Sequence, residues 1–260
     1  MVTIVENDIV PALLETISKE FDEKTYSSLK LKKALTLLEN KQATYLDVNE
    51  FAVEIGEILA SVLDANITVS ILPDGKMYFN IADRILNSTM AKNHELISNF
   101  AVDVQTDLNH AAGLKLKGQK PELNQDRIDG LVNRLSSGES FDDIKWLLDE
   151  PLISFSQSIA DDAIKRNVDF HFESGLQPKI TRRLSGHACD WCKSLAGTYD
   201  YPANVPEGLY RRHERCRCTV EYNPKDSRGV QNSHSKKWRA QKQQEKTEQR
   251  KLMNIKSRQA

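Results

Sequence analysis

The chain has 260 residues, of which 39% are hydrophobic and 28% are charged, and its formal net charge is -1. This composition is typical of a soluble protein with a hydrophobic core, built as one large domain or two modest ones. The sequence contains no apolar run near the ~18 residues of a membrane span, and residues 1–8 lack the basic start and apolar middle of a signal peptide. We therefore expect a protein kept in a reducing cytoplasm.

The charges are unevenly distributed along the chain. Residues 225–260 contain eleven Lys or Arg against three Asp or Glu, a net charge of +8, and residues 1–224 carry a net charge of -9. An acidic body with a basic tail favours a tail that contacts nucleic acid or an acidic protein surface. A solvated tail, disordered or helical, is the alternative.

The N-terminal third predicts helices and one hairpin. Apolar residues at helical spacing predict two amphipathic helices within residues 8–39, with Pro11 in a first turn, and a third helix over 47–63 capped by Thr44 or Asp47. Residues 67–80 then alternate apolar and polar side chains around the turn sequence Leu-Pro-Asp-Gly at 72–75. This pattern predicts a β-hairpin.

The middle of the chain predicts further helices. The helical period covers residues 81–112, and the polar stretch 115–125, with Gly118 and Pro121, predicts a connection. Two shorter helices are expected over 127–135 and 141–148. A longer helix opens at Pro151 and ends at Ser174 and Gly175, which is a usual helix stop.

All four cysteines and one histidine lie within thirty residues. Cys189 and Cys192 form a C-x-x-C pair, and His213, Cys216 and Cys218 form an H-x-x-C-x-C cluster twenty residues later. Thiolate and imidazole donors in two clusters suit a tetrahedral zinc site, and a reducing compartment favours metal ligands over two disulfides. We expect structural zinc, because four protein ligands leave no open position for water.

Five candidate ligands exist for four zinc positions. We favour Cys189, Cys192, His213 and Cys216, with Cys218 as the chief substitute. Nearby arginines can offset the negative charge of a zinc centre with several thiolates, or can form an exposed basic turn. They are Arg211, Arg212, Arg215 and Arg217.

Aromatic residues also gather around the cysteines. Such side chains can stack on nucleic-acid bases, but a small domain held by zinc needs bulky side chains for its limited core, so packing is favoured. The aromatic residues are Trp191, Tyr199, Tyr201, Tyr210 and Tyr222.

Two patterns in the sequence are similar to parts of enzyme signatures. His171-Phe172-Glu173 followed by Cys189 and Cys192 is similar to a zinc deaminase signature, but Ala188 stands where that signature has Pro. An HNH-type nuclease would use residue types found at His213, Asn223, Asn232 and His234, but the paired His, or Asp-His, before the catalytic Asn is missing. This nuclease stays the alternative to a protein without catalysis.

Three segments resemble the head morphogenesis family of tailed bacteriophages, which includes protein F of phage Mu. They are residues 169–180, 189–201 and 210–220, and the resemblance covers roughly residues 150–225. The motif residues are Cys189, Cys192, Leu195, Gly197, His213, Cys216, Arg217 and Cys218. The similarity is greatest to versions from phages and prophages of Gram-positive bacteria.

The resemblance implies a minor capsid protein, present in a few copies in the procapsid and associated with portal, scaffold or major capsid protein, without established catalysis. The chain would be in the host cytoplasm during assembly and in the capsid interior of the virion, with no membrane partner. Its basic tail could contact packaged DNA or an acidic portal or capsid surface.

We therefore expect an α+β fold: a mainly α-helical body, a small zinc-stapled C-terminal module and a basic tail. The expected domains are an N-terminal helical region with the hairpin (1–113), the helical part of the head morphogenesis domain (114–175), a zinc-binding module (176–224) and the tail (225–260).

Overall fold

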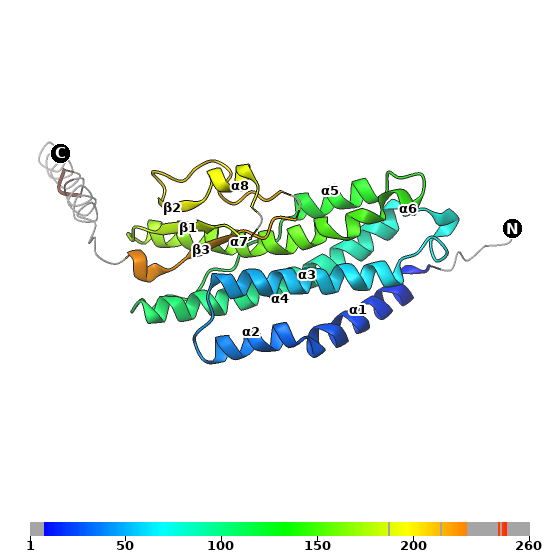
Figure 1. Ribbon diagram of the computed structural model, residues 1–260, viewed down its shortest axis with the longest axis horizontal. Coiled ribbons are helices and arrows are strands. Elements are labelled where there is room, and N and C mark those ends of the chain that lie inside the picture. The colour runs from blue at the N-terminus through cyan, green and yellow to red at the C-terminus, as the bar shows by residue number, and fades with distance from the viewer. Residues whose placement is uncertain (1–7, 187, 214, 228–243, 245, 249–260) are drawn as a thin grey trace, which may run out of the picture.

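The computed structural model describes residues 8–186, 188–213, 215–227, 244 and 246–248. The protein is mainly helical with a small three-stranded antiparallel sheet, as expected (Figure 1). The helices are α1 (Val10–Ser27), α2 (Leu29–Glu39), α3 (Tyr45–Asn66), α4 (Phe79–Ala111), α5 (Gln125–Leu135), α6 (Phe141–Ile144), α7 (Glu150–Glu173) and α8 (Asp190–Ser194), with 3₁₀ turns η1 (Pro73–Gly75), η2 (Lys145–Leu148) and η3 (Pro224–Ser227). The strands are β1 (Lys179–Arg183), β2 (Gly197–Asp200) and β3 (Thr219–Tyr222).

Three long helices, α3, α4 and α7, contact one another and form the centre of the molecule. The α1 and α2 helices cover α3 on one side, while α5 packs against α4 (Figure 1). The buried faces carry apolar side chains at helical spacing, so burial of these faces is the main source of stability. The expected helices are therefore confirmed in order, but the one expected over 141–148 is divided into the short helix α6 and the 3₁₀ turn η2.

The start of α3 shows how local sequence sets a helix boundary. The backbone N–H of Thr44 donates to Asp47 Oδ2 at 2.7 Å, and the Thr44 hydroxyl contacts the same oxygen at 2.9 Å. Asp47 therefore satisfies a backbone donor that the helix cannot, as in a capping box. Of the two predicted caps, Thr44 is the N-cap.

The prediction of a β-hairpin at residues 67–80 is wrong. Residues 67–78 contain no strand; they form a loop with η1, and α4 begins at Phe79. Ile67, Leu72 and Met77 are buried in the core that the helices share, whereas Val69 and Ile71 are exposed. A lone two-stranded hairpin is marginal in water, so the loop gains more by inserting these three side chains into the core.

The strands lie in the order β2-β1-β3, with β1 antiparallel to both neighbours. The sheet lies beside α7 (Figure 1), and β3 contacts both α3 and α7. Ile180, Val220 and Tyr222 are buried in the same core as the helices. Packing on the body therefore stabilises the sheet.

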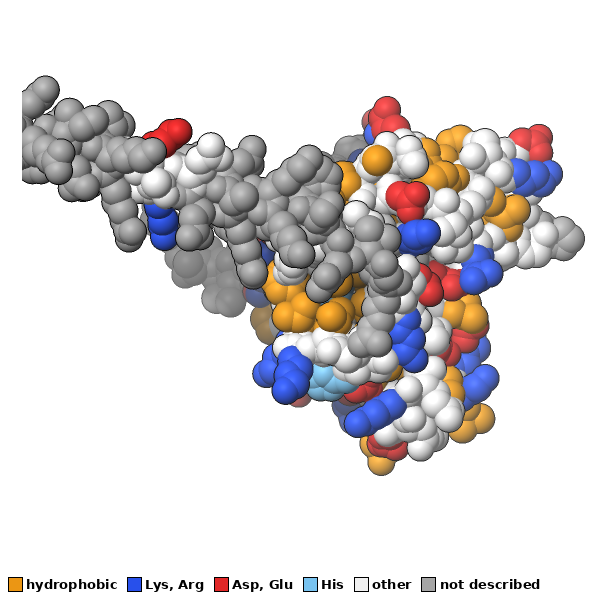
Figure 2. Space-filling model, turned by 90° about the vertical axis from the view of Figure 1, so that its left-hand side faces the viewer, with side chains coloured by type: hydrophobic (Ala, Val, Ile, Leu, Met, Phe, Trp, Pro, Cys, Tyr) orange, Lys and Arg blue, Asp and Glu red, His pale blue; other side chains and the backbone are white. Residues whose placement is uncertain are grey.

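No helix among the described residues is both long and apolar enough to span a membrane. Most of the basic tail lies outside the described residues, so its expected disorder and contacts stay predictions. Figure 2 views the left-hand end of the molecule in Figure 1, where Lys or Arg and Asp or Glu side chains are mixed.

Candidate metal centre

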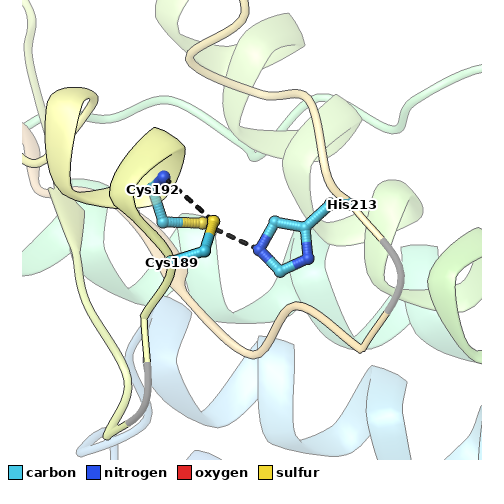
Figure 3. A group of neighbouring side chains, drawn as sticks. All are labelled: Cys189, Cys192 and His213. Atoms are coloured by element: carbon cyan, nitrogen blue, oxygen red, sulfur yellow. Dashed lines mark hydrogen bonds between the residues drawn. The ribbon is translucent and has the colours of Figure 1, made fainter.

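The first pair of donors lies at the start of α8. Cys189 is the N-cap of this helix, and its Sγ accepts a hydrogen bond from the backbone N–H of Cys192 at 3.4 Å (Figure 3). This spacing places the Cys189 and Cys192 sulfurs on the same side of the turn. The C-x-x-C spacing therefore places two sulfurs close together, as the sequence predicted.

The second cluster lies in the loop that leads into β3. Arg215 has a φ of 57°, and the backbone N–H of Cys216 donates to the His213 carbonyl at 3.1 Å. This tight turn brings His213 and Cys216 close together in space. Cys218 immediately precedes β3.

The fold brings all five candidate ligands together. Cys189, Cys192 and His213 form one group of donors within 4.8 Å of one another, and Cys192, Cys216 and Cys218 form a second. Cys192 Sγ lies 3.1 Å from His213 Nε2 and 3.7 Å from Cys216 Sγ. Cys192 is therefore the donor common to both groups.

These distances suit a tetrahedral zinc site. Two sulfurs that each lie about 2.3 Å from a tetrahedral zinc are about 3.8 Å apart, close to the Cys192–Cys216 separation. All four cysteines are free, so the structure forms no disulfide between them. Cys192, Cys216 and Cys218 are buried, and Cys189 and His213 are exposed. Each of the two groups of donors could therefore hold a metal ion.

Protonation of the thiols differs across the cluster. Burial raises the pKa of Cys192 to about 12, and its thiol neighbour Cys216 adds to the rise. The backbone N–H of Cys192 lowers the pKa of Cys189. Metal binding at Cys192 must therefore displace a firmly held proton, which a divalent cation can do because it binds the thiolate.

Arg212 links the ligand loop to α7. Its guanidinium donates to Asp161 Oδ2 at 2.5 Å and to Oδ1 at 2.8 Å, and both side chains are buried. It also donates to Asn49 Oδ1 at 3.1 Å and to the Cys218 carbonyl at 2.6 Å. This arginine hydrogen-bonds to a carboxylate, an amide oxygen and a loop carbonyl, and its charge also interacts with the Cys216 and Cys218 thiols.

The other three predicted arginines also differ in place. Arg217 binds the carboxylate of Glu150 at the start of α7, with a closest distance of 2.7 Å. Arg211 is exposed and lies 3.4 Å from Glu207, and Arg215 is exposed in the turn. Arg211 and Arg217 thus pair with carboxylates, whereas the charge of Arg212 also interacts with the thiols of Cys216 and Cys218, which is the charge compensation that the sequence predicted for it.

Arg182, on β1, is the arginine that contacts the sulfurs. Its Nη2 lies 3.8 Å from Cys192 Sγ and 3.9 Å from Cys216 Sγ, and the residue is 3% exposed. Sequence reasoning missed it because it precedes the cysteine cluster. The available signal was an arginine two residues after Ile180, on the inward face of a short strand.

Most of the aromatic residues near the cysteines pack within the protein. The Tyr222 hydroxyl lies 2.6 Å from His171 Nδ1, and the Tyr201 ring meets the Phe172 ring edge-on while its hydroxyl donates to Asp169. Trp191 is 41% exposed and packs edge-on against the His213 ring, with centroids 6.0 Å apart. These contacts favour packing over base stacking.

The structure describes only some of the residues on which the two enzyme interpretations depend. His171 is buried against Tyr222 and belongs to neither donor group among the described residues. His213 lies among the cysteines, Asn223 lies just after β3, and Asn232 and His234 lie outside the described residues. The described residues therefore do not test whether His213 and Asn223 lie near Asn232 and His234, as the nuclease interpretation requires.

Comparison with protein-family models, with curated proteins and with solved structures finds no match to this chain.

Proposed function

We propose that this chain is a minor capsid protein of a tailed phage or prophage, with a structural role in procapsid assembly near the portal. In this proposal a structural zinc ion holds residues 184–218 in place. The basic tail contacts packaged DNA or an acidic surface of the portal or capsid.

The observation that carries the proposal is the placement of the residues through which the chain resembles the head morphogenesis family. Five of them are the gathered cysteines and His213. Leu195 is buried, and Gly197 starts β2 with a φ of 151°, a conformation that side chains disfavour. Arg217 pairs with Glu150. These placements support a structural role for the motif residues, as the proposal requires.

The donor set supports a structural ion. Four protein donors close a tetrahedral zinc site, and a closed site contributes folding free energy. A groove of 620 Å³ lies between α2, α3 and the sheet and is lined by Arg217 and Thr219, which flank Cys218, and a groove of 610 Å³ lies between α1, α2 and α4. A zinc ion closed by four protein donors would act on the fold.

Elemental analysis of five variants tests the metal centre. We expect one zinc per wild-type chain, and we expect four of the variants Cys189→Ser, Cys192→Ser, His213→Ala, Cys216→Ser and Cys218→Ser to lose it. The fifth should keep it and thereby identify the residue that is not a ligand. A wild-type chain purified without bound metal, and unable to take up zinc, would contradict the centre.

Mass spectrometry of particles tests the assembly role. Procapsids and mature particles from cells that encode the chain should contain it in few copies, and crosslinking should connect it to portal, scaffold or coat. A chain found only in the soluble lysate, with particles formed normally after its gene is deleted, would contradict the proposal.

A plasmid-cleavage assay tests the alternative. The purified chain, incubated with divalent metal and plasmid, should leave the DNA intact. Reproducible cleavage that His234→Ala abolishes would favour the nuclease over the capsid role.

A further inference from the structure

The Arg182 side chain lies between the two elements that carry the candidate ligands. Its Nη1 donates to the carbonyl of Leu209 and, at 3.2 Å, to that of Arg211, two residues before His213. Its Nη2 points to the sulfurs of Cys192, on α8, and Cys216, in the loop. One guanidinium thus contacts both halves of the cluster.

The charge of Arg182 calls for an anion in this environment. A guanidinium stays protonated, and burying a charge is costly unless it is paired and hydrogen-bonded. Among the described residues, no carboxylate lies within ion-pair distance of Arg182, and no acceptor binds its buried Nε. The Cys192 and Cys216 sulfurs are the groups in contact that can become anionic.

The strand explains why Arg182 is in this position. Side chains alternate between the two faces of a strand, so Arg182 shares a face with Ile180. Ile180 is 0% exposed and lies in the core shared with the helices, and Arg182 continues this inward face as far as the sulfurs. The Trp191 ring lies 5.4 Å from the guanidinium carbon and covers it.

We infer that Arg182 is a positioning residue of the metal centre, which compensates the negative charge of the Cys192 and Cys216 thiolates and ties them to the loop that carries His213. This inference rests on the proposed zinc site. Three thiolates and one neutral imidazole around Zn²⁺ would carry a net charge of -1, which one guanidinium in contact with the sulfurs would offset. Groups that hydrogen-bond to metal ligands tune affinity in this way.

The test compares three variants of Arg182 by Co²⁺ binding to the full chain. Arg182→Met removes the charge and the donors, Arg182→Gln keeps amide donors without charge, and Arg182→Lys keeps charge without the planar fork. We expect Arg182→Met to bind Co²⁺ about 10- to 100-fold more weakly in competition with a chelator, the usual loss for such partners. Arg182→Lys should bind more tightly than Arg182→Gln.

The absorption spectrum of the Co²⁺ complex separates this role from a purely structural one. Donation by the guanidinium lowers the energy of the sulfur lone pairs, so its removal should shift the thiolate-to-cobalt charge-transfer band to longer wavelength. Arg183→Met is the matched control, because Arg183 is adjacent, largely exposed and paired with Glu221. This control should keep the wild-type affinity and band.

Each outcome decides the inference. Wild-type affinity and spectrum in Arg182→Met would overturn it. The same result in Arg182→Gln would also overturn it, because hydrogen bonds to the Leu209 and Arg211 carbonyls would then be enough without the positive charge. If circular dichroism shows that Arg182→Met does not fold, the Lys and Gln variants carry the comparison, and equal affinities would overturn the inference. A wild-type chain that binds no metal would instead overturn the zinc site itself.

Discussion

At the scale of single residues, His171 connects burial to pH. Its ring is fully buried at the end of α7, and burial lowers its pKa to about 4. The unfolded chain, with an ordinary histidine pKa of about 6.5, therefore binds a proton that the folded chain does not. Stability from this group is complete above about pH 6.5 and is lost as the pH falls toward 4.

We predict that His171→Gln flattens this pH dependence, because glutamine does not titrate. Urea unfolding between about pH 7 and pH 5 should show a smaller loss of unfolding free energy in the variant than in the wild type. Tyr222→Phe is the control: it removes the hydroxyl that contacts His171 but leaves the histidine buried, so it should lower stability by about 1 kcal/mol and keep the slope. Equal slopes in His171→Gln and wild type would contradict the prediction.

At the scale of elements, α3 and α7 approach closely at a glycine. A Cβ on Gly56 would lie 2.8 Å from Ser156 Oγ and 2.9 Å from Ile153 Cα, too close for either helix to stay in place. We predict that Gly56→Ala lowers the free energy of unfolding by about 1–3 kcal/mol, since overpacking outweighs the better helix propensity of alanine. Chemical denaturation measures this change.

Gly130 provides the matched control, because it is also inside a helix, α5, and a Cβ there meets nothing within 4 Å. Gly130→Ala should therefore stabilise the protein by about 0.5–1 kcal/mol. A Gly56→Ala variant that gains stability as Gly130→Ala does would show that α3 and α7 can separate without cost.

At the scale of the whole molecule, the proposed zinc ion would stabilise the residues around the candidate metal centre more than it would stabilise the helices. Residues 184–218 contain few buried apolar side chains, whereas the helices share a continuous core. We predict that chelation leaves the helical circular dichroism nearly unchanged but exposes residues 184–218 to limited proteolysis, because this region then has the lowest local stability. Mass spectrometry of the first fragments identifies the cleavage sites.

Restoring zinc should protect the same bonds, and Cys192→Ser should be cleaved there with or without zinc. First cleavage within α3 or α4 after chelation would mean that the ion supports the entire fold. In that case the Arg212–Asp161 and Arg217–Glu150 pairs, which join the ligand loop to α7, would transmit the loss of metal to the body.

The sequence by itself determined what depends on neighbours along the chain. The helices follow from apolar spacing, the start of α3 follows from Thr44 and Asp47, and the two donor clusters follow from short cysteine and histidine spacings. Each of these signals lies within a few turns of chain, where the backbone geometry already sets which side chains meet.

Only the tertiary structure decided which distant groups share one environment. Residues 67–78 form a loop because Ile67, Leu72 and Met77 are buried in the helical core, which stabilises them more than a lone hairpin would. Arg212 pairs with Asp161, 51 positions away in the sequence, and Arg182 on β1 contacts the sulfurs of α8 and the ligand loop. No local sequence pattern predicts such pairings, because the fold determines which side chains lie beside a buried charge.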